Sequence, residues 1–213
     1  MPAAPKPSAD FIYLASQSPR RRQLLDQLGV PHRPLLPEPG PEAEAAEALE
    51  AVLPGEAPAA YVQRVTALKL KAAQARARGR GLPPAPILCA DTTVALGRRI
   101  LGKPADAAEA AAMLAALSGR AHKVHTAVAV AASPTSRKPL AALSSSTVEF
   151  AALPAMAIAA YIATGEPFGK AGAYAIQSAW GGRIARIAGS YTGIMGLPLF
   201  ETAELLRQLR LNC

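Results

Sequence analysis

The hydrophobic pattern changes its period several times along the chain and so predicts strands and helices in turn. Apolar runs bounded by glycine and proline are typical of strands, and apolar residues that recur every three or four positions are typical of helices. No internal repeat and no interdomain linker interrupts the pattern. The predicted strands are 11–16, 33–36, 87–96, a strand within 118–132, 140–153 and 183–187, and the predicted helices are 19–28, 58–78, 107–118, 154–163 and one that begins near 198.

The segment that precedes the helix at 58–78 lacks a clear period. Its five prolines between Pro31 and Pro41 exclude a long helix, because proline removes a backbone donor and clashes with the preceding turn. We therefore expect a short edge strand followed by an acidic loop. The glutamates of this loop are candidate metal ligands, and most of them are expected to be solvated: Glu38, Glu42, Glu44, Glu47 and Glu50.

The first predicted helix begins with a turn suited to anions. Ser18 fits the N-cap, Pro19 the first helical position and Gly29 the position past the end. The turn offers free backbone N–H groups, hydroxyls and guanidinium groups, which bind phosphate well. It predicts either a polyphosphate-binding turn or an ordinary strand–helix unit with solvated arginines. The side chains concerned are Ser16, Ser18, Arg20, Arg21 and Arg22.

A carboxylate interrupts the otherwise apolar strand at 87–96. Burying Asp91 is costly unless it has a partner, a metal or a place at the open end of the strand, so we favour a functional role over a structural one. A turn then brings Lys103 back beside the strand, and one carboxylate with one lysine suits phosphoryl chemistry. On the helix at 58–78, Lys69 lies next to the apolar stripe and either points into a cleft or extends along the surface.

Two further polar groupings lie in the second half of the chain. Residues 165–177 hold three glycines and predict a loop that lets the backbone approach a ligand. In the simpler interpretation of this loop, Glu166 and Lys170 pair with each other. His122 and His125 are three positions apart on a strand, so they point to opposite faces, and we assign them structural roles rather than a shared metal site.

The overall composition limits the function without choosing it. The formal net charge of +8 attracts anions, yet it does not separate nucleotides, nucleic acid and membrane surfaces. Cys89 and Cys213 are too few for a disulfide framework and indicate a reducing compartment. Residues 1–9 are predicted to be a disordered tail, and no stretch resembles a signal peptide or has the length of a membrane span. We therefore expect a cytoplasmic protein with no membrane partner.

Five separated stretches occur in an order found in one known family. They are LASQSPRRRQLL, ADTTV, ILGKP, LSGRAHKVHT, and GEPFGKAGAYAIQ leading to GSYTGIMGLPLFET. Together they resemble the Maf family of nucleotide pyrophosphatases, also called septum formation inhibitors. The resemblance implies a single α/β domain over 10–213 with the inosine-triphosphatase-like fold, in which a long twisted mixed sheet is flanked by helices and two lobes surround a central cleft. It also implies hydrolysis of a nucleoside triphosphate to the monophosphate and pyrophosphate with a divalent metal, Mg²⁺ or Mn²⁺, in a cytoplasmic homodimer.

The functional residues of the family fall on charged and polar positions of this sequence. The resemblance implies that Asp91 is the catalytic residue, which acts either as a metal ligand or by activating water directly. As a second metal ligand we prefer Glu42 to Glu38. The implied phosphate and substrate contacts are Ser16, Arg20, Arg21, Lys69 and Lys103.

Three positions separate the substrate branches of the family. Arg20, Thr92 and Gln177 match the branch that acts on dTTP and UTP, and not the branch that acts on 7-methyl-GTP. A glutamine side chain both donates and accepts, which suits the O4 and N3–H groups of uracil and thymine, so we expect discrimination against CTP. The sequence departs from the family pattern at Gly169, where aspartate is common, and at Ser178, where glycine is usual.

Two other functions are compatible with the sequence. A non-catalytic nucleic-acid-binding protein or cell-division regulator would account for the net charge and for the basic helix at 69–80. Against it, the sequence shows no aromatic stacking platform and no recognised nucleic-acid motif, so nucleic acid is a disfavoured partner. A pyrophosphatase for modified pyrimidine nucleotides would use the same residues as the dTTP/UTP enzyme.

Overall fold

The protein, described here for residues 10–211 by a computed structural model, is built on one mixed sheet of seven strands. Their order is β2-β1-β3-β5-β6-β7, with β4 paired to the end of β3. β1 runs parallel to both of its neighbours, and the other pairs are antiparallel. The strands are β1 (Ile12–Leu14), β2 (His32–Pro34), β3 (Ile87–Leu96), β4 (Arg99–Leu101), β5 (Ala121–Ala131), β6 (Leu140–Phe150) and β7 (Ile184–Ala188).

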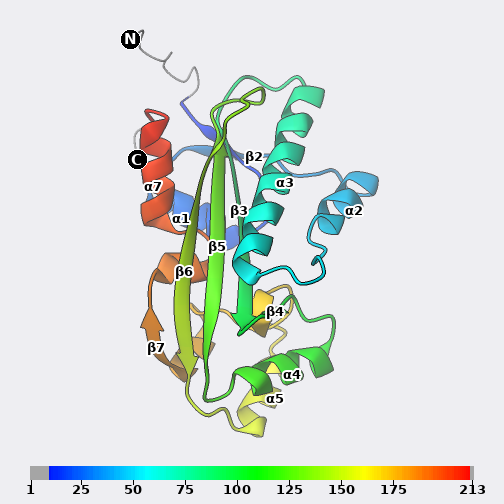
Figure 1. The fold of residues 1–213 in the computed structure, drawn as a ribbon, viewed down its shortest axis with the longest axis vertical. Coiled ribbons are helices and arrows are strands. Elements are labelled where there is room, and N and C mark those ends of the chain that lie inside the picture. Colours follow the sequence, from blue (N-terminus) through cyan, green and yellow to red (C-terminus); the bar gives the residue numbers. More distant parts are fainter. Residues whose placement is uncertain (1–9, 212–213) are drawn as a thin grey trace.

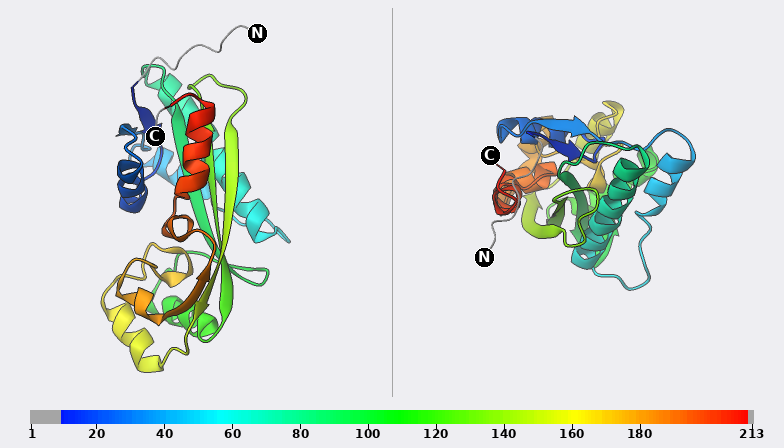
Figure 2. Two further views of the ribbon diagram at one scale, coloured as in Figure 1. Left: turned by 90° about the vertical axis from the view of Figure 1, so that its left-hand side faces the viewer. Right: turned by 90° about the horizontal axis from the view of Figure 1, so that it is seen from above.

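Helices cover both faces of the sheet. α3 packs on β3 and β5, whereas α6 and α7 pack against β5 and β6 from the other side (Figure 2). The helices α1, α2, α3 and α7 gather around one end of the long strands, and α4 and α5 around the other (Figure 1). The helices are α1 (Pro19–Gln27), α2 (Pro41–Ala48), α3 (Pro58–Gly79), α4 (Ala107–Leu117), α5 (Ala155–Ala163), α6 (Tyr191–Met195) and α7 (Leu199–Gln208), with 3₁₀ turns η1 (Ala171–Ala173) and η2 (Ala179–Arg183).

The residue pattern of β5 explains why the sheet needs cover on both sides. Val128 and Val130 belong to the main apolar core, while Ala127 packs with the apolar side of α3 on the opposite face. Continuous burial of a strand indicates that both faces are covered. Near its start, by contrast, β5 alternates between exposed and buried residues, as at Lys123 and Val124, because only one face is covered there. The α/β class and the mixed sheet are therefore confirmed.

Most of the predicted elements occur where the sequence places them, but the acidic loop does not. The strand at 87–96 and the helix at 58–78 match β3 and α3 closely. The loop prediction is wrong because α2 occupies Pro41–Ala48. Pro41 lies in the first turn of α2, where the missing backbone N–H is tolerated, so the prolines exclude a helix only before that residue. The predicted tail at 1–9 and Cys213 lie outside the described residues.

Candidate active site

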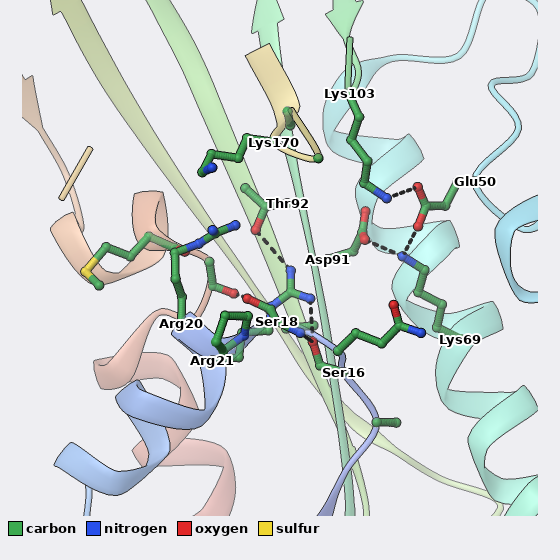
Figure 3. Close-up of a pocket in the computed structure, with 18 of the residues that line it drawn as sticks. Ser16, Ser18, Arg20, Arg21, Glu50, Lys69, Asp91, Thr92, Lys103 and Lys170 are labelled. Carbon is green, nitrogen blue, oxygen red and sulfur yellow. Dashed lines mark hydrogen bonds and ion pairs between the residues drawn. The ribbon is translucent and has the colours of Figure 1, made fainter. Parts of the chain in front are cut away.

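A cavity of about 430 Å³ lies beside β3, between the turn before α1 and the helix α3. The turn before α1, the ends of α2 and α6, the middle of α3, and β3 all contribute to its lining, as does the loop that contains η1 (Figure 3). These segments are far apart in the sequence and meet only in the fold. The predicted site residues that line this cavity are Ser16, Arg20, Arg21, Lys69, Asp91, Thr92, Lys103 and Gln177.

The arginine turn is held rigidly at one side of the cavity. Arg21 donates from Nη1 to Ser16 Oγ at 3.0 Å and from Nε to the Gly196 carbonyl at 2.8 Å. Arg20 donates from Nε to the Met195 carbonyl at 3.3 Å, whereas the neighbouring Arg22 is exposed. Burial lowers the pKa of Arg21 from its usual value, and the nearby Asp91 carboxylate opposes that shift. Two guanidinium groups thus lie fixed beside the cavity, and preorganised groups of this kind bind phosphate with little loss of side-chain entropy.

Acidic and basic side chains alternate across the other side of the cavity. Lys69 Nζ donates to Asp91 Oδ1 at 2.5 Å and to Glu50 Oε1 at 2.7 Å, and Lys103 Nζ donates to Glu50 Oε2 at 2.9 Å (Figure 3). Burial alone would lower the pKa of Lys69, but the two carboxylates outweigh it and raise that pKa. Burial likewise would raise the pKa of Glu50, yet the two lysines hold it below its usual value. The charges of Lys69 and Glu50 are therefore maintained at neutral pH.

Glu50, one of the five candidate glutamates, is a site residue that no local pattern distinguishes from the other four. The preferred candidate, Glu42, instead accepts from Arg76 Nε at 2.5 Å and from Arg80 Nη2 at 3.1 Å. Glu42 does not line the cavity, whereas Glu50, just past the end of α2, does. No spacing rule in the sequence marks Glu50, because its proximity to Asp91 depends on how α2 folds back toward α3.

The carboxylates at the cavity are ligands of the kind that divalent cations prefer, but they do not form a complete coordination shell. Within residues 10–211 no group of three or more histidine, cysteine, aspartate or glutamate side chains converges. Asp91 and Glu50 nevertheless approach one point, which the Lys69 ammonium fills. Mg²⁺ is usually held in proteins by one or two carboxylates together with substrate phosphates. The pair therefore fits a cation that enters with its nucleotide.

Comparison with known sequences places the chain in a family. The sequence model described as Maf-like protein matches residues 11–209. The chain belongs to the Maf family. A relative named dTTP/UTP pyrophosphatase from a Polaromonas species is 62% identical over 201 residues, which are 94% of this chain and 96% of the relative. A relative of the same name from Burkholderia pseudomallei is 60% identical over 207 residues, 97% of each chain. Among solved structures, a HAM1 protein from Coxiella burnetii aligns with 67% of this chain and 74% of its own at 19% identity, with a TM-score of 0.42.

The glycine-rich motif of this Maf chain packs against β3. A side chain at Gly172 would lie 2.8 Å from Val94 Cγ1, and its φ of +69° also favours glycine. The Gly172 N–H donates to the Gly102 carbonyl at 3.0 Å, so the loop is tied to the segment that carries Lys103. Lys170 donates to the backbone carbonyl of Glu166. The contact is with that backbone oxygen, not with the Glu166 carboxylate.

The two histidines of the Maf motif on β5 do not contact each other. His122 is buried and its Nε2 lies 2.8 Å from the Tyr174 hydroxyl, while His125 Nδ1 lies 2.8 Å from Ser145 Oγ. Burial lowers the pKa of His122 to about 4, so this side chain is neutral at physiological pH. Both contacts fit the structural roles predicted for these residues.

Proposed function

We propose that this protein hydrolyses nucleoside triphosphates, above all dTTP and UTP, to the monophosphate and pyrophosphate. The observation that carries the proposal is the row Asp91–Lys69–Glu50–Lys103, which faces two fixed arginines across one cavity. Relatives at 60–62% identity bear the name dTTP/UTP pyrophosphatase.

The cationic side chains provide the binding energy for a triphosphate. Arg20 and Arg21 present guanidinium groups that match phosphate oxygens. Lys69 and Lys103 are each paired to carboxylates in the ligand-free protein. Phosphate oxygens would compete for these ammonium groups and free the carboxylates. The site therefore exchanges internal ion pairs for contacts to the substrate.

Asp91 and Glu50 are the residues that would hold a divalent metal, Mg²⁺ or Mn²⁺. When bound, such an ion polarises the phosphoryl group and neutralises charge on the departing pyrophosphate. In the reaction, the oxygen of water forms a bond to the α-phosphorus and its proton passes to a base, while the bond from that phosphorus to the oxygen shared with the β-phosphorus breaks and pyrophosphate leaves with that oxygen. A metal-bound carboxylate is a poor base, so ligation and proton acceptance by Asp91 are alternative roles.

A panel of nucleoside triphosphates incubated with Mg²⁺ or Mn²⁺, with pyrophosphate release measured by rate, tests the proposal. We expect the fastest release from dTTP and UTP, and Asp91→Asn should abolish it without changing the melting temperature by more than a few degrees. Asp26→Asn is a matched control, because Asp26 lies on α1 with a side chain that is 72% exposed. Absence of release from every nucleotide would overturn the proposal. Modified pyrimidine nucleotides in the same panel test the alternative that the protein is a pyrophosphatase for such nucleotides.

The alternative of nucleic-acid binding loses support from the contacts of the basic helix. Arg76 and Arg80 pair with Glu42, and Arg78 Nη1 donates to the Pro134 carbonyl at 2.6 Å. These guanidinium groups stabilise the fold rather than form a free basic surface.

A homodimer in the cytoplasm completes the proposal, and light scattering of the purified protein tests its oligomeric state. Within residues 10–211, no helix is long and apolar enough to cross a membrane.

A further inference from the structure

A row of hydrogen bonds runs from the cavity into the core. Arg21 Nη2 donates to Thr92 Oγ1 at 3.4 Å, Thr92 Oγ1 lies 2.9 Å from Thr126 Oγ1, and Thr126 Oγ1 donates to the Gly193 carbonyl at 2.7 Å. Thr126 is on β5 and is only 1% exposed, whereas Thr92 lines the cavity. The row thus joins a cavity residue to a buried one.

The chemistry of its two ends fixes the direction of every proton in the row. A carbonyl oxygen only accepts, so the single hydroxyl proton of Thr126 is used on Gly193. Thr126 can therefore only accept from Thr92, and the Thr92 proton is used there. Guanidinium groups only donate, so Arg21 uses one of the two lone pairs on Thr92 Oγ1. Thr92 Oγ1 can therefore accept a hydrogen bond from a ligand through its remaining lone pair, but it has no proton left to donate.

We propose that Thr126 is a specificity-determining positioning residue, which holds Thr92 as an acceptor toward the nucleobase. The proposal rests on the proposed function and names how that site reads its base. Uracil and thymine carry a ring donor, N3–H, whereas the corresponding nitrogen of cytosine is an acceptor. An acceptor fixed opposite N3 accepts a hydrogen bond from uracil or thymine. Opposite cytosine it faces the lone pair of N3, so neither the acceptor nor N3 has a hydrogen-bond partner.

Contrary to the expectation from the sequence, the Gln177 amide alone does not provide discrimination against CTP. Its amide has a donor and an acceptor side by side, and rotation by half a turn exchanges them. One orientation matches the O4 and N3–H groups of uracil, and the other matches the N4 amino group and N3 of cytosine. A group whose proton cannot reorient is required to separate the two bases, and Thr92 is such a group because Thr126 holds it.

The test is the ratio of kcat/KM for UTP to that for CTP in the full-length protein and in Thr126→Val. Valine has the shape of threonine but lacks the acceptor, so the Thr92 hydroxyl is freed to donate toward the cavity. We expect the ratio to fall about three- to tenfold, as for one hydrogen bond of ordinary strength. Thr126→Ser keeps the hydroxyl and should keep the wild-type ratio.

Thr66→Val is the matched control, because Thr66 is also 1% exposed but donates to the Val62 carbonyl within α3, away from the cavity lining. It should leave the ratio unchanged. An unchanged ratio in Thr126→Val, or an equal fall in Thr126→Ser, would overturn the inference. Failure of the wild-type protein to hydrolyse either nucleotide would instead overturn the proposed function, so the two failures are distinguishable. Melting temperatures of all variants identify any loss of folding.

Discussion

Replacing Glu50 by glutamine separates its two roles, as a structural ion-pair partner and as a candidate metal ligand. Glu50 accepts from Lys69 at 2.7 Å and from Lys103 at 2.9 Å. The Lys103 side chain is 56% exposed, whereas that of Lys69 is 21% exposed, so the Lys103 pair contributes less than about 1 kcal/mol. A hydrogen bond to a charged group contributes about 1.5–3 kcal/mol. Glutamine retains one acceptor oxygen, so we expect Glu50→Gln to lower the free energy of unfolding by about 1–2 kcal/mol.

The same substitution should have a much larger effect on metal dependence. Loss of a group that only supports a metal ligand typically lowers affinity about 10- to 100-fold, and loss of a direct ligand costs at least as much. We therefore expect the concentration of Mg²⁺ or Mn²⁺ at half-maximal activity to rise by at least about 10-fold in Glu50→Gln. The assay is pyrophosphate release from UTP at saturating nucleotide over a range of metal concentrations. Chemical denaturation of the same preparation measures the change in the free energy of unfolding.

Glu42→Gln is the control, since it removes a comparable ion pair whose carboxylate lies outside the cavity lining. Glu42 lies 2.5 Å from Arg76 Nε, whose side chain is only 6% exposed. Its loss should therefore cost a similar amount of stability but leave the metal requirement unchanged. The reasoning would be refuted by the opposite pattern, in which Glu42→Gln raises the metal requirement and Glu50→Gln does not.

Three further outcomes follow from contacts around the site. Arg64 donates to the Ala51 carbonyl at 2.8 Å and so holds the segment after Glu50. Arg64→Gln should therefore reduce activity most strongly at limiting metal concentration. Gln63→Ala, on the exposed side of α3, should leave activity at limiting metal unchanged. The two lysines lower the pKa of Glu50, so the stabilisation from this ion pair is fully present above about pH 4.3, the unfolded-state pKa. The difference in stability between wild type and Glu50→Gln should therefore shrink as the pH falls through the lower folded-state pKa. A difference that stays constant with pH in denaturation experiments would contradict this. Burial raises the pKa of the Cys89 thiol to about 12, so in a Cys213→Ser background iodoacetamide should label Cys89 only on unfolding, as mass spectrometry can determine.

The sequence predicts best those features whose causes are local. The apolar run of β3 makes Asp91 conspicuous, because a carboxylate among buried neighbours needs a compensating group. The spacing of Val62 and Val65 likewise defines the buried side of α3. In both cases the chain within a few residues contains the information, and the structure agrees closely.

The choice between Glu42 and Glu50 has no such local cause. Glu50 reaches Lys69 across 19 residues of sequence and Lys103 across 53. Both glutamates lie in one polar stretch of similar composition, so nothing in their surroundings marks either as buried. Only the packing of α2 and the following segment against α3 places Glu50 at the cavity and Glu42 against Arg76.

The motif that contains α6 shows a second way in which a site escapes prediction from side chains. Its contribution is made by three backbone carbonyls, those of Gly193, Met195 and Gly196, which accept from Thr126, Arg20 and Arg21. The Met195 and Gly196 oxygens lie at the C-terminal end of α6, where carbonyl groups are left without helical partners and favour cations, and the Gly193 oxygen accepts from the Gly196 N–H as well as from Thr126. One uncharged turn therefore orients Arg20, Arg21 and the hydroxyl row that ends at Thr92. Because a carbonyl cannot donate, the turn also sets the direction of the hydroxyl protons in that row, and in the proposed function the same backbone would link phosphate binding to base selection.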